Sequence, residues 1–174
     1  VNGTTNFILS DMDDSGVSYS DALRVAQKKG YAEADPTNDV CGYDAARKLA
    51  ILASIGFRAN VTFDDVLVEG IEKISQKDIQ YASEMNYTIK LLAVAMRQEN
   101  GIALNVYPAF VPRSHPLASV KGSYNAIYVT GNIVEDVMFY GRGAGSLPTA
   151  SAVMGDVIST AKHILNHSTG TEMM

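Results

Sequence analysis

The sequence has no tryptophan and only one cysteine and three histidines among its 174 residues. A single cysteine, Cys41, excludes an internal disulfide and a cysteine-based zinc site, and it makes a reducing, cytoplasmic setting the default expectation. Cys41 could be a nucleophile, but no histidine lies near it in the sequence. A small buried side chain at the start of a helix is the favoured interpretation. His115, His163 and His167 are scattered, so we expect structural or solvent-facing roles from them rather than catalysis.

Long apolar runs and basic clusters are also missing. No run approaches the ~18 apolar residues that span a bilayer, and the first residues show no signal-peptide pattern. A formal net charge of −5 without a cluster of Lys and Arg argues against nucleic acid or an anionic membrane as a partner. The length allows about one domain with a sizeable core. Because the chain starts at Val1 and enters a turn-and-cap sequence at once, we expect a piece of a longer protein.

Apolar spacing and capping residues predict helices first, strands later and a last helix. The expected helices cover residues 4–12, 18–30, 40–56, 75–85 and 146–166, with Thr4 or Thr5 as the cap of the first. The expected strands cover 60–69, 87–97, 102–106, 126–130 and 134–140, with hairpin turns at 99–101 and 131–132. The 87–97 segment is apolar on both faces, as in a central strand, and prolines should divide 108–116 into edge or loop pieces. This order predicts an α+β fold with a mixed, largely antiparallel sheet. Helices should pack on one face and leave the other available for dimerisation.

The main candidate for a functional group of charged side chains lies in residues 30–53. Asp44 and Lys48 are four residues apart on an expected helix, so their side chains share one face. Glu33 and Asp39 precede them in a loop stiffened by proline. One lysine among carboxylates suits the binding of a small zwitterion and the transfer of a proton. A surface ion pair is the alternative. Because the rest of the helix is apolar, a position at the mouth of a pocket is equally favoured.

Lysine has the chemistry that a carbonyl reduction needs, since an ammonium can donate a proton to a developing alkoxide. Burial would lower the pKa of Lys48 and the Asp44 carboxylate would raise it, and the sequence leaves this balance open. Asp39 could simply cap the helix and Asp35 could close a turn. Glu33 has no such local role and is the best candidate for an ammonium ligand. The spacing of the carboxylates does not match a calcium loop, so no metal site is expected.

A second candidate is the glycine-rich loop 141–145 before the last helix. Glycines there allow backbone N–H groups to approach a ligand closely. The loop lacks the G-x-G-x-x-G spacing of a dinucleotide fingerprint, so a tight connection is the favoured interpretation from the pattern alone.

Together these segments resemble homoserine dehydrogenase. The resemblance is carried in order, over nearly the whole chain, by NGTTNFIL at 2–9, GYAEADPTNDVCGYDAARKLAILA at 30–53, VEGI at 68–71, PLASVKGSYNAI at 116–127 and YGRGAGSLPTASAV at 140–153.

The resemblance implies an oxidoreductase of amino-acid biosynthesis. Members of the family reduce aspartate 4-semialdehyde to homoserine with NADPH or NADH, on the route to threonine, methionine and isoleucine. They join a Rossmann nucleotide-binding domain to a substrate-binding and dimerisation domain, and only the latter is similar to this chain. We therefore expect residues 1–167 to be an excised catalytic and dimerisation domain, with a disordered tail at 168–174. The expected partners are an amino-acid substrate, the missing nucleotide-binding domain and a second copy.

Individual roles also follow from the resemblance. Lys48 would protonate the aldehyde oxygen, and Glu33 and Asp44 would hold the polar groups of the substrate. Further residues implied in substrate binding are Asp39, Tyr31, Gly3 and Thr4, and those implied near the nicotinamide of NADP or NAD are Gly143, Ala144 and Gly145. Two alternatives stay open: a non-catalytic oligomerisation or regulatory module of the same fold, and a related amino-acid dehydrogenase with a different acidic substrate.

Overall fold

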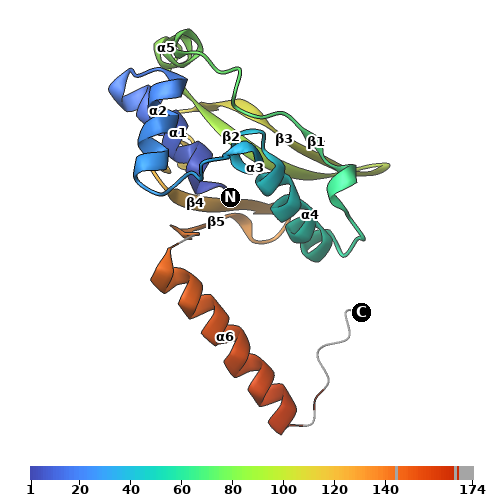
Figure 1. Ribbon diagram of the computed structural model, residues 1–174. Helices are drawn as coiled ribbons and strands as arrows, with labels where there is room; N and C mark the ends of the chain where they lie inside the picture. The colour runs from blue at the N-terminus through green and yellow to red at the C-terminus, as the bar shows by residue number, and fades with distance from the viewer. Residues whose placement is uncertain (144, 167, 169–174) are drawn as a thin grey trace.

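The computed structural model describes residues 1–143, 145–166 and 168. Its elements, in chain order, are α1 (Gly3–Ser15), α2 (Tyr19–Lys28), α3 (Thr37–Val40), α4 (Tyr43–Phe57), the 3-10 helix η1 (Phe63–Asp65), β1 (Leu67–Val68), α5 (Gln76–Glu84), β2 (Tyr87–Gln98), β3 (Gly101–Pro112), the 3-10 helix η2 (Pro116–Ser119), β4 (Tyr124–Gly131), β5 (Glu135–Arg142) and α6 (Ser146–Leu165) (Figure 1). The predicted α+β class is confirmed. Of the predicted tail, 168–174, all but Ser168 lies outside the described residues.

The strands form two sheets. The larger one has the order β1-β3-β2, with β1 parallel and β2 antiparallel to β3. The smaller one is the antiparallel hairpin of β4 and β5, which lies below the larger sheet in Figure 1. The prediction of a mixed, largely antiparallel arrangement is therefore confirmed.

Two helix boundaries differ from the prediction. Asn2 caps α1, in place of a threonine, because its side chain accepts a hydrogen bond from Thr5 N at 2.8 Å. The single helix expected over 40–56 is divided into α3 and α4 at Gly42, whose φ of 84° is left-handed. A Cβ there would lie 3.0 Å from Val106 and 3.1 Å from Val68, so the glycine also allows the chain to approach the sheet closely.

The observed strands differ from the sequence prediction in two places. β3 continues through Pro108 to Pro112, where loop or edge pieces were expected. β1 pairs only with Asn105 and Val106, so β3 has one unpaired edge beyond them within the described residues, and proline is tolerated at such an edge. β2, expected to be central, is an edge strand of the larger sheet as described.

The core consists of two neighbouring apolar clusters beneath the helices. In the first, Ile8, Leu9 and Met12 of α1 are fully or almost fully buried against residues of α2, α5 and β2. In the second, α4 packs its alanine-rich face on Leu104 and Val106 of β3. Small side chains on α4 let this helix lie close to the sheet, which fixes the direction in which its first turn points.

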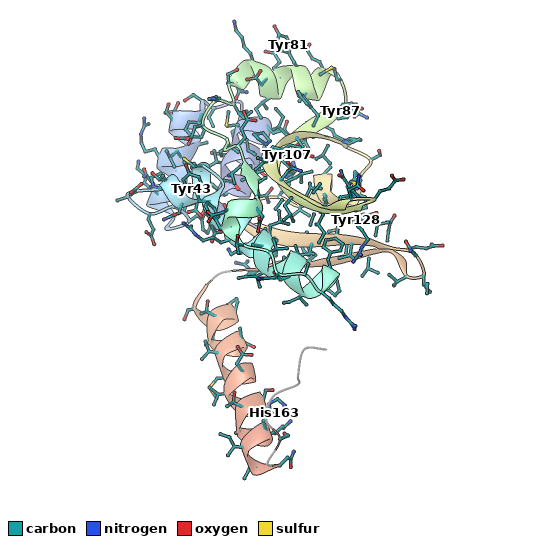
Figure 2. The ribbon with its side chains drawn as sticks, turned by 90° about the vertical axis from the view of Figure 1, so that its right-hand side faces the viewer. Tyr43, Tyr81, Tyr87, Tyr107, Tyr128 and His163 are labelled. Carbon is teal, nitrogen blue, oxygen red and sulfur yellow. The ribbon has the colours of Figure 1, made fainter. Side chains whose placement is uncertain are left out.

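Apolar surface remains uncovered in two regions. On the opposite face of the larger sheet, Tyr107 and Met96 are 37% and 56% exposed. α6 projects away from the rest of the molecule, and none of its residues is buried (Figures 1 and 2). Its exposed large apolar side chains are Leu147, Val153, Met154, Val157, Ile158, Ile164 and Leu165. Within the described residues, no helix combines the length and apolarity required to cross a membrane.

One lysine is buried where helix, sheet and hairpin meet. Lys90 on β2 is only 6% exposed, and its Nζ donates to Asn6 Oδ1 at 2.8 Å and to the carbonyl oxygen of Val120 at 2.6 Å. Asn6 in turn donates to the carbonyl oxygens of Gly122 and Tyr124. Burial is the main reason that the pKa of Lys90 falls to about 8. This network ties α1 to the start of β4.

We predict that the free energy of unfolding rises by about 2 kcal/mol between pH 7 and pH 9.5 through Lys90 alone. Between pH 8 and the ordinary lysine value of 10.5, the unfolded chain binds more protons at this site than the folded chain, so raising the pH favours folding. Urea unfolding of wild type and Lys90→Met at both pH values measures the difference. Lys162→Met, on exposed α6, is the control and should keep the wild-type pH dependence. An equal pH dependence in wild type and Lys90→Met would contradict the prediction.

Candidate active site

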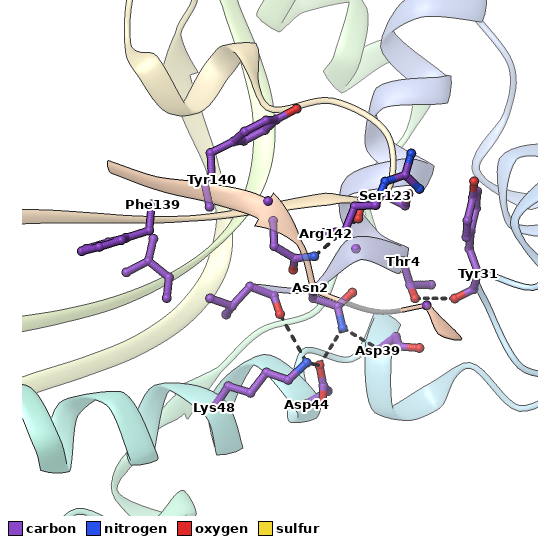
Figure 3. Close-up of a pocket in the computed structure, with 18 of the residues that line it drawn as sticks. Asn2, Thr4, Tyr31, Asp39, Asp44, Lys48, Ser123, Phe139, Tyr140 and Arg142 are labelled. Carbon is purple, nitrogen blue, oxygen red and sulfur yellow. Dashed lines mark hydrogen bonds and ion pairs between the residues drawn. The ribbon is translucent and has the colours of Figure 1, made fainter. Parts of the chain in front are cut away.

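A cavity of about 680 Å³ lies between the helices and the β4–β5 hairpin (Figure 3). One wall is made by the start of α1, the loop after α2 and the first turn of α4. The other is made by the start of β4, the end of β5 and glycines of the loop before α6. Segments from both halves of the chain therefore meet there.

Lys48 and Asp44 lie on the helical wall as the i, i+4 spacing predicts. Lys48 Nζ is 2.8 Å from Asp44 Oδ2 and 3.4 Å from the carbonyl oxygen of Val1. Their side chains are 50% and 32% exposed, and a pair this accessible contributes only about 0.3–0.5 kcal/mol to stability. The pair therefore matters for orientation: Asp44 holds the ammonium at the cavity, and both side chains line it.

Asn2 organises the acidic side of the cavity, and the sequence did not identify it as a site residue. Its Nδ2 donates to Asp39 Oδ1 at 2.7 Å and to Asp44 Oδ2 at 2.9 Å. Its Oδ1 accepts from the backbone N–H and the hydroxyl of Thr5. A nearly buried amide thus joins the two carboxylates to the start of α1. The sequence signal was the turn-and-cap segment at residues 2–6, whose cap was assigned to the threonines.

The loop after α2 is fixed to α1 beside the cavity. Thr4 Oγ1 donates to the carbonyl oxygen of Tyr31 at 2.6 Å, and the rings of Tyr31 and Phe7 lie 5.0 Å apart. Thr4 and Tyr31 both line the cavity. Asp35 lies farther along the loop and closes a turn, accepting from the N–H and hydroxyl of Thr37. The hydroxyl bond from Thr37 is the main reason that the pKa of Asp35 is lowered.

Glu33 is placed differently from the other predicted site residues. It is exposed and does not line the cavity, and its backbone carbonyl accepts a hydrogen bond from Gln27 Nε2 at 3.1 Å. Its assignment as an ammonium ligand stays a prediction. Asp39 and Asp44 are the carboxylates that do line the cavity.

Two glycines allow close contacts at the hairpin wall, one between α1 and this wall and one within the wall. A Cβ on Gly3 would lie 2.8 Å from the carbonyl oxygen of Ser123, and one on Gly143 would lie 2.6 Å from Asn125 Nδ2. Gly143 and Gly145 line the cavity, while Ala144 lies outside the described residues. Gly145 has a φ of 124° and starts α6 without a side-chain cap, so backbone N–H groups at this end can serve an anionic or polar ligand.

Neither Cys41 nor the two histidines in the described part of the chain line this cavity. His115 caps η2 by accepting from Leu117 N at 3.1 Å, and His163 lies on α6, away from the remainder of the molecule (Figure 2). His167 is outside the described residues. Cys41 is partly buried and donates to Glu72 Oε2 at 3.0 Å. That bond is the main reason that the pKa of the thiol rises to about 11, so it stays protonated at neutral pH. Among the residues with described positions, no His, Cys, Asp or Glu cluster could hold a metal ion.

Comparison with known proteins connects this geometry to one family. The family model for homoserine dehydrogenase matches residues 1–158. This chain belongs to the homoserine dehydrogenase family. It is 54% identical, over 94% of its length, to homoserine dehydrogenase of Corynebacterium glutamicum. It is 47% identical over its whole length to that of Bacillus subtilis.

Solved structures of family members share the fold. A homoserine dehydrogenase from Thiobacillus denitrificans superposes with a TM-score of 0.92 at 47% identity, covering 95% of this chain and 38% of that one. A hyperthermophilic archaeal homoserine dehydrogenase in complex with NADPH superposes with a TM-score of 0.73 at 30% identity, covering 93% of this chain and 46% of that one. The chain spans 38% of the Corynebacterium relative and 40% of the Bacillus relative, so it corresponds to part of these enzymes.

We predict that Asn2→Asp destabilises the fold by about 2 kcal/mol at pH 7. The new carboxylate keeps the cap acceptor but loses the amide donor and adds a negative charge within hydrogen-bonding distance of Asp39 and Asp44. Asn2→Ser is the matched control, because it retains a cap acceptor without the charge. Denaturant titrations of wild type and both variants at pH 7 measure the effect, and equal stabilities of the two variants would exclude charge repulsion as its cause.

Proposed function

We propose that this chain is the substrate-binding and catalytic domain of a homoserine dehydrogenase, reducing L-aspartate 4-semialdehyde to L-homoserine with NADPH or NADH. The observation that carries the proposal is the ammonium of Lys48, held by Asp44 at a cavity that also contains the glycine loop before α6. A family member could lack the activity, but these groups have the chemistry that the reaction needs.

The reaction requires a hydride and a proton on the two atoms of one carbonyl. The dinucleotide supplies the hydride to carbon when bound. Lys48 donates a proton to the oxygen as its negative charge develops, and accepts it in the reverse direction. Asp44 orients the ammonium through a hydrogen bond of 2.8 Å.

The amino-acid part of the substrate needs partners of opposite charge. Asp39 and Asp44 are the carboxylates in the cavity and suit the ammonium of the substrate, with Asn2 keeping both in place. Thr4, Gly3 and the backbone of the loop at Tyr31 close this end of the cavity. Glu33 would have to turn inwards to take part, and we retain it as a candidate for the complex with substrate.

We assign the cofactor and the protein partners to the surfaces that the described residues leave uncovered. The backbone near Gly143 and Gly145 offers one edge for the nicotinamide end of a dinucleotide, whose remainder belongs to the nucleotide-binding domain. The apolar side chains of α6 form a surface suited to packing on that domain. The open face of the larger sheet, with Met96 and Tyr107, is the proposed surface for a second copy.

In the longer enzyme, we predict that Lys48→Ala lowers kcat by a factor on the order of 100 or more, with a much smaller change in KM for homoserine. The variant removes the proton donor but leaves the carboxylates that bind the substrate. Lys77→Ala, at an exposed position on α5 outside the cavity, is the control and should keep the wild-type rate. Steady-state kinetics in both directions provides the measurement, and an unchanged kcat would remove Lys48 from the proposed mechanism.

We also predict that the isolated chain shows no NADPH-dependent turnover, because most of the nucleotide site belongs to the other domain. Absorbance at the nicotinamide band during incubation with homoserine and NADP or NAD checks this. Oxidation of homoserine by the pure chain would refute the assignment of domains.

Calorimetric titration of the two-domain protein with homoserine separates an enzyme from a non-catalytic module, which would release no heat.

A further inference from the structure

The charge of the cavity is opposite to that of the whole chain. The sequence carries a formal net charge of −5, yet the side chains around the cavity include three cations, Lys29, Lys48 and Arg142, against two carboxylates, Asp39 and Asp44. The proposed mechanism uses Lys48 and both carboxylates. It leaves Lys29 and Arg142 without a role, although both side chains line the same space.

Both unused cations are held by aromatic rings. Lys29 Nζ lies 5.0 Å from the centre of the Phe7 ring, on the helical wall. Arg142 Cζ lies 5.0 Å from the centre of the Tyr124 ring, on the hairpin wall. The Tyr124 ring is itself stacked on Tyr140, with centres 5.0 Å apart. A cation–π contact orients the cation over the aromatic ring and leaves its N–H donors available for other partners.

Neither side chain has an acidic partner in the part of the chain that the structure describes. The ion pairs there join Arg24 to Asp21, Lys48 to Asp44, Arg113 to Asp13 and Lys121 to Asp14. No carboxylate oxygen in these residues lies within 4.0 Å of Lys29 or Arg142, and neither donates a side-chain hydrogen bond. Figure 3 shows Arg142 at the side of the cavity away from Lys48 and Asp44.

We propose that Lys29 and Arg142 form a clamp for an anionic oxygen group of a reactant, with Arg142 on the side of the cavity away from the proton donor. The inference rests on the proposed function and extends it with two specificity residues. Two sources present such a group in the cavity: the α-carboxylate of the amino-acid substrate and a phosphate of the dinucleotide. Guanidinium donors recognise either one in a bidentate manner, whereas the ammonium of lysine adds charge without fixed geometry.

The test uses the two-domain enzyme that carries this chain, with the variants Lys29→Met, Arg142→Met and the double variant. Methionine keeps an unbranched stem over each aromatic ring and removes the charge. Arg142→Lys is the conservative variant, expected to recover part of the loss. Arg24→Met is the matched control, because Arg24 is exposed, is paired to Asp21 and does not line the cavity. Thermal melts verify that each variant is folded, which is expected since both substituted side chains lie at the surface.

KM for homoserine and for the dinucleotide are measured separately. Removal of one charge should raise one of these KM values about ten-fold, with a larger effect in the double variant and kcat within about three-fold of wild type. A rise confined to homoserine, with weaker discrimination between homoserine and its uncharged amide, assigns the clamp to the α-carboxylate. A rise confined to the dinucleotide assigns it to a phosphate.

Both KM values within two-fold of wild type in the double variant would overturn the clamp, and so would a loss in Arg24→Met equal to that in Arg142→Met. Lys48→Ala is measured in the same series. If Lys48→Ala loses kcat while the double variant behaves as wild type, the clamp fails and the proposed function stands. If Lys48→Ala keeps kcat, the proposed mechanism itself fails.

Discussion

The amide of Asn2 is the contact on which the site depends. Asp39 lies in the short helix α3 and Asp44 in the first turn of α4, and without a donor between them their like charges would oppose each other. Asn2 resolves this with two hydrogen bonds, while its oxygen caps a third helix, α1. One side chain thus sets the relative positions of three helices. The orientation of Lys48 follows from it, because Asp44 is fixed before it pairs with the ammonium.

A second polar contact fixes the other wall. Lys90 and Asn6 join the sheet, α1 and the start of β4, so the hairpin stays at a defined distance from the helices. Both Asn2 and Asn6 belong to the first residues of the chain. The same short segment therefore serves the acidic wall with one asparagine and the hairpin wall with the other. Polar networks with little exposure to solvent favour one defined arrangement of the segments that they join.

Local patterns in the sequence predicted the features that depend on residues close together along the chain. The α+β order, the hairpins and the Asp44–Lys48 pair depend on spacing along one helix or strand, and they are present. The sequence failed where distant contacts decide. Asn2 could not be chosen over Thr4 or Thr5 as a cap, because its second role depends on Asp39 and Asp44. Strand β3 passes through Pro108 because β1 is short, and no local pattern in the sequence predicts the length of β1. Family resemblance supplied the roles of the glycine loop.

The hairpin wall has a consequence for dynamics. Asn6 reaches a carbonyl 116 residues farther along the chain, so the cavity closes only when sequence-distant segments have met. The acidic wall, by contrast, consists of segments within about the first quarter of the chain. Contacts of such different range allow the hairpin to detach in a local opening while the helical bundle stays intact. Amide hydrogen exchange would then be faster across β4 and β5 than in α1 and α4, and Lys48 would remain positioned even in molecules whose cavity is momentarily open.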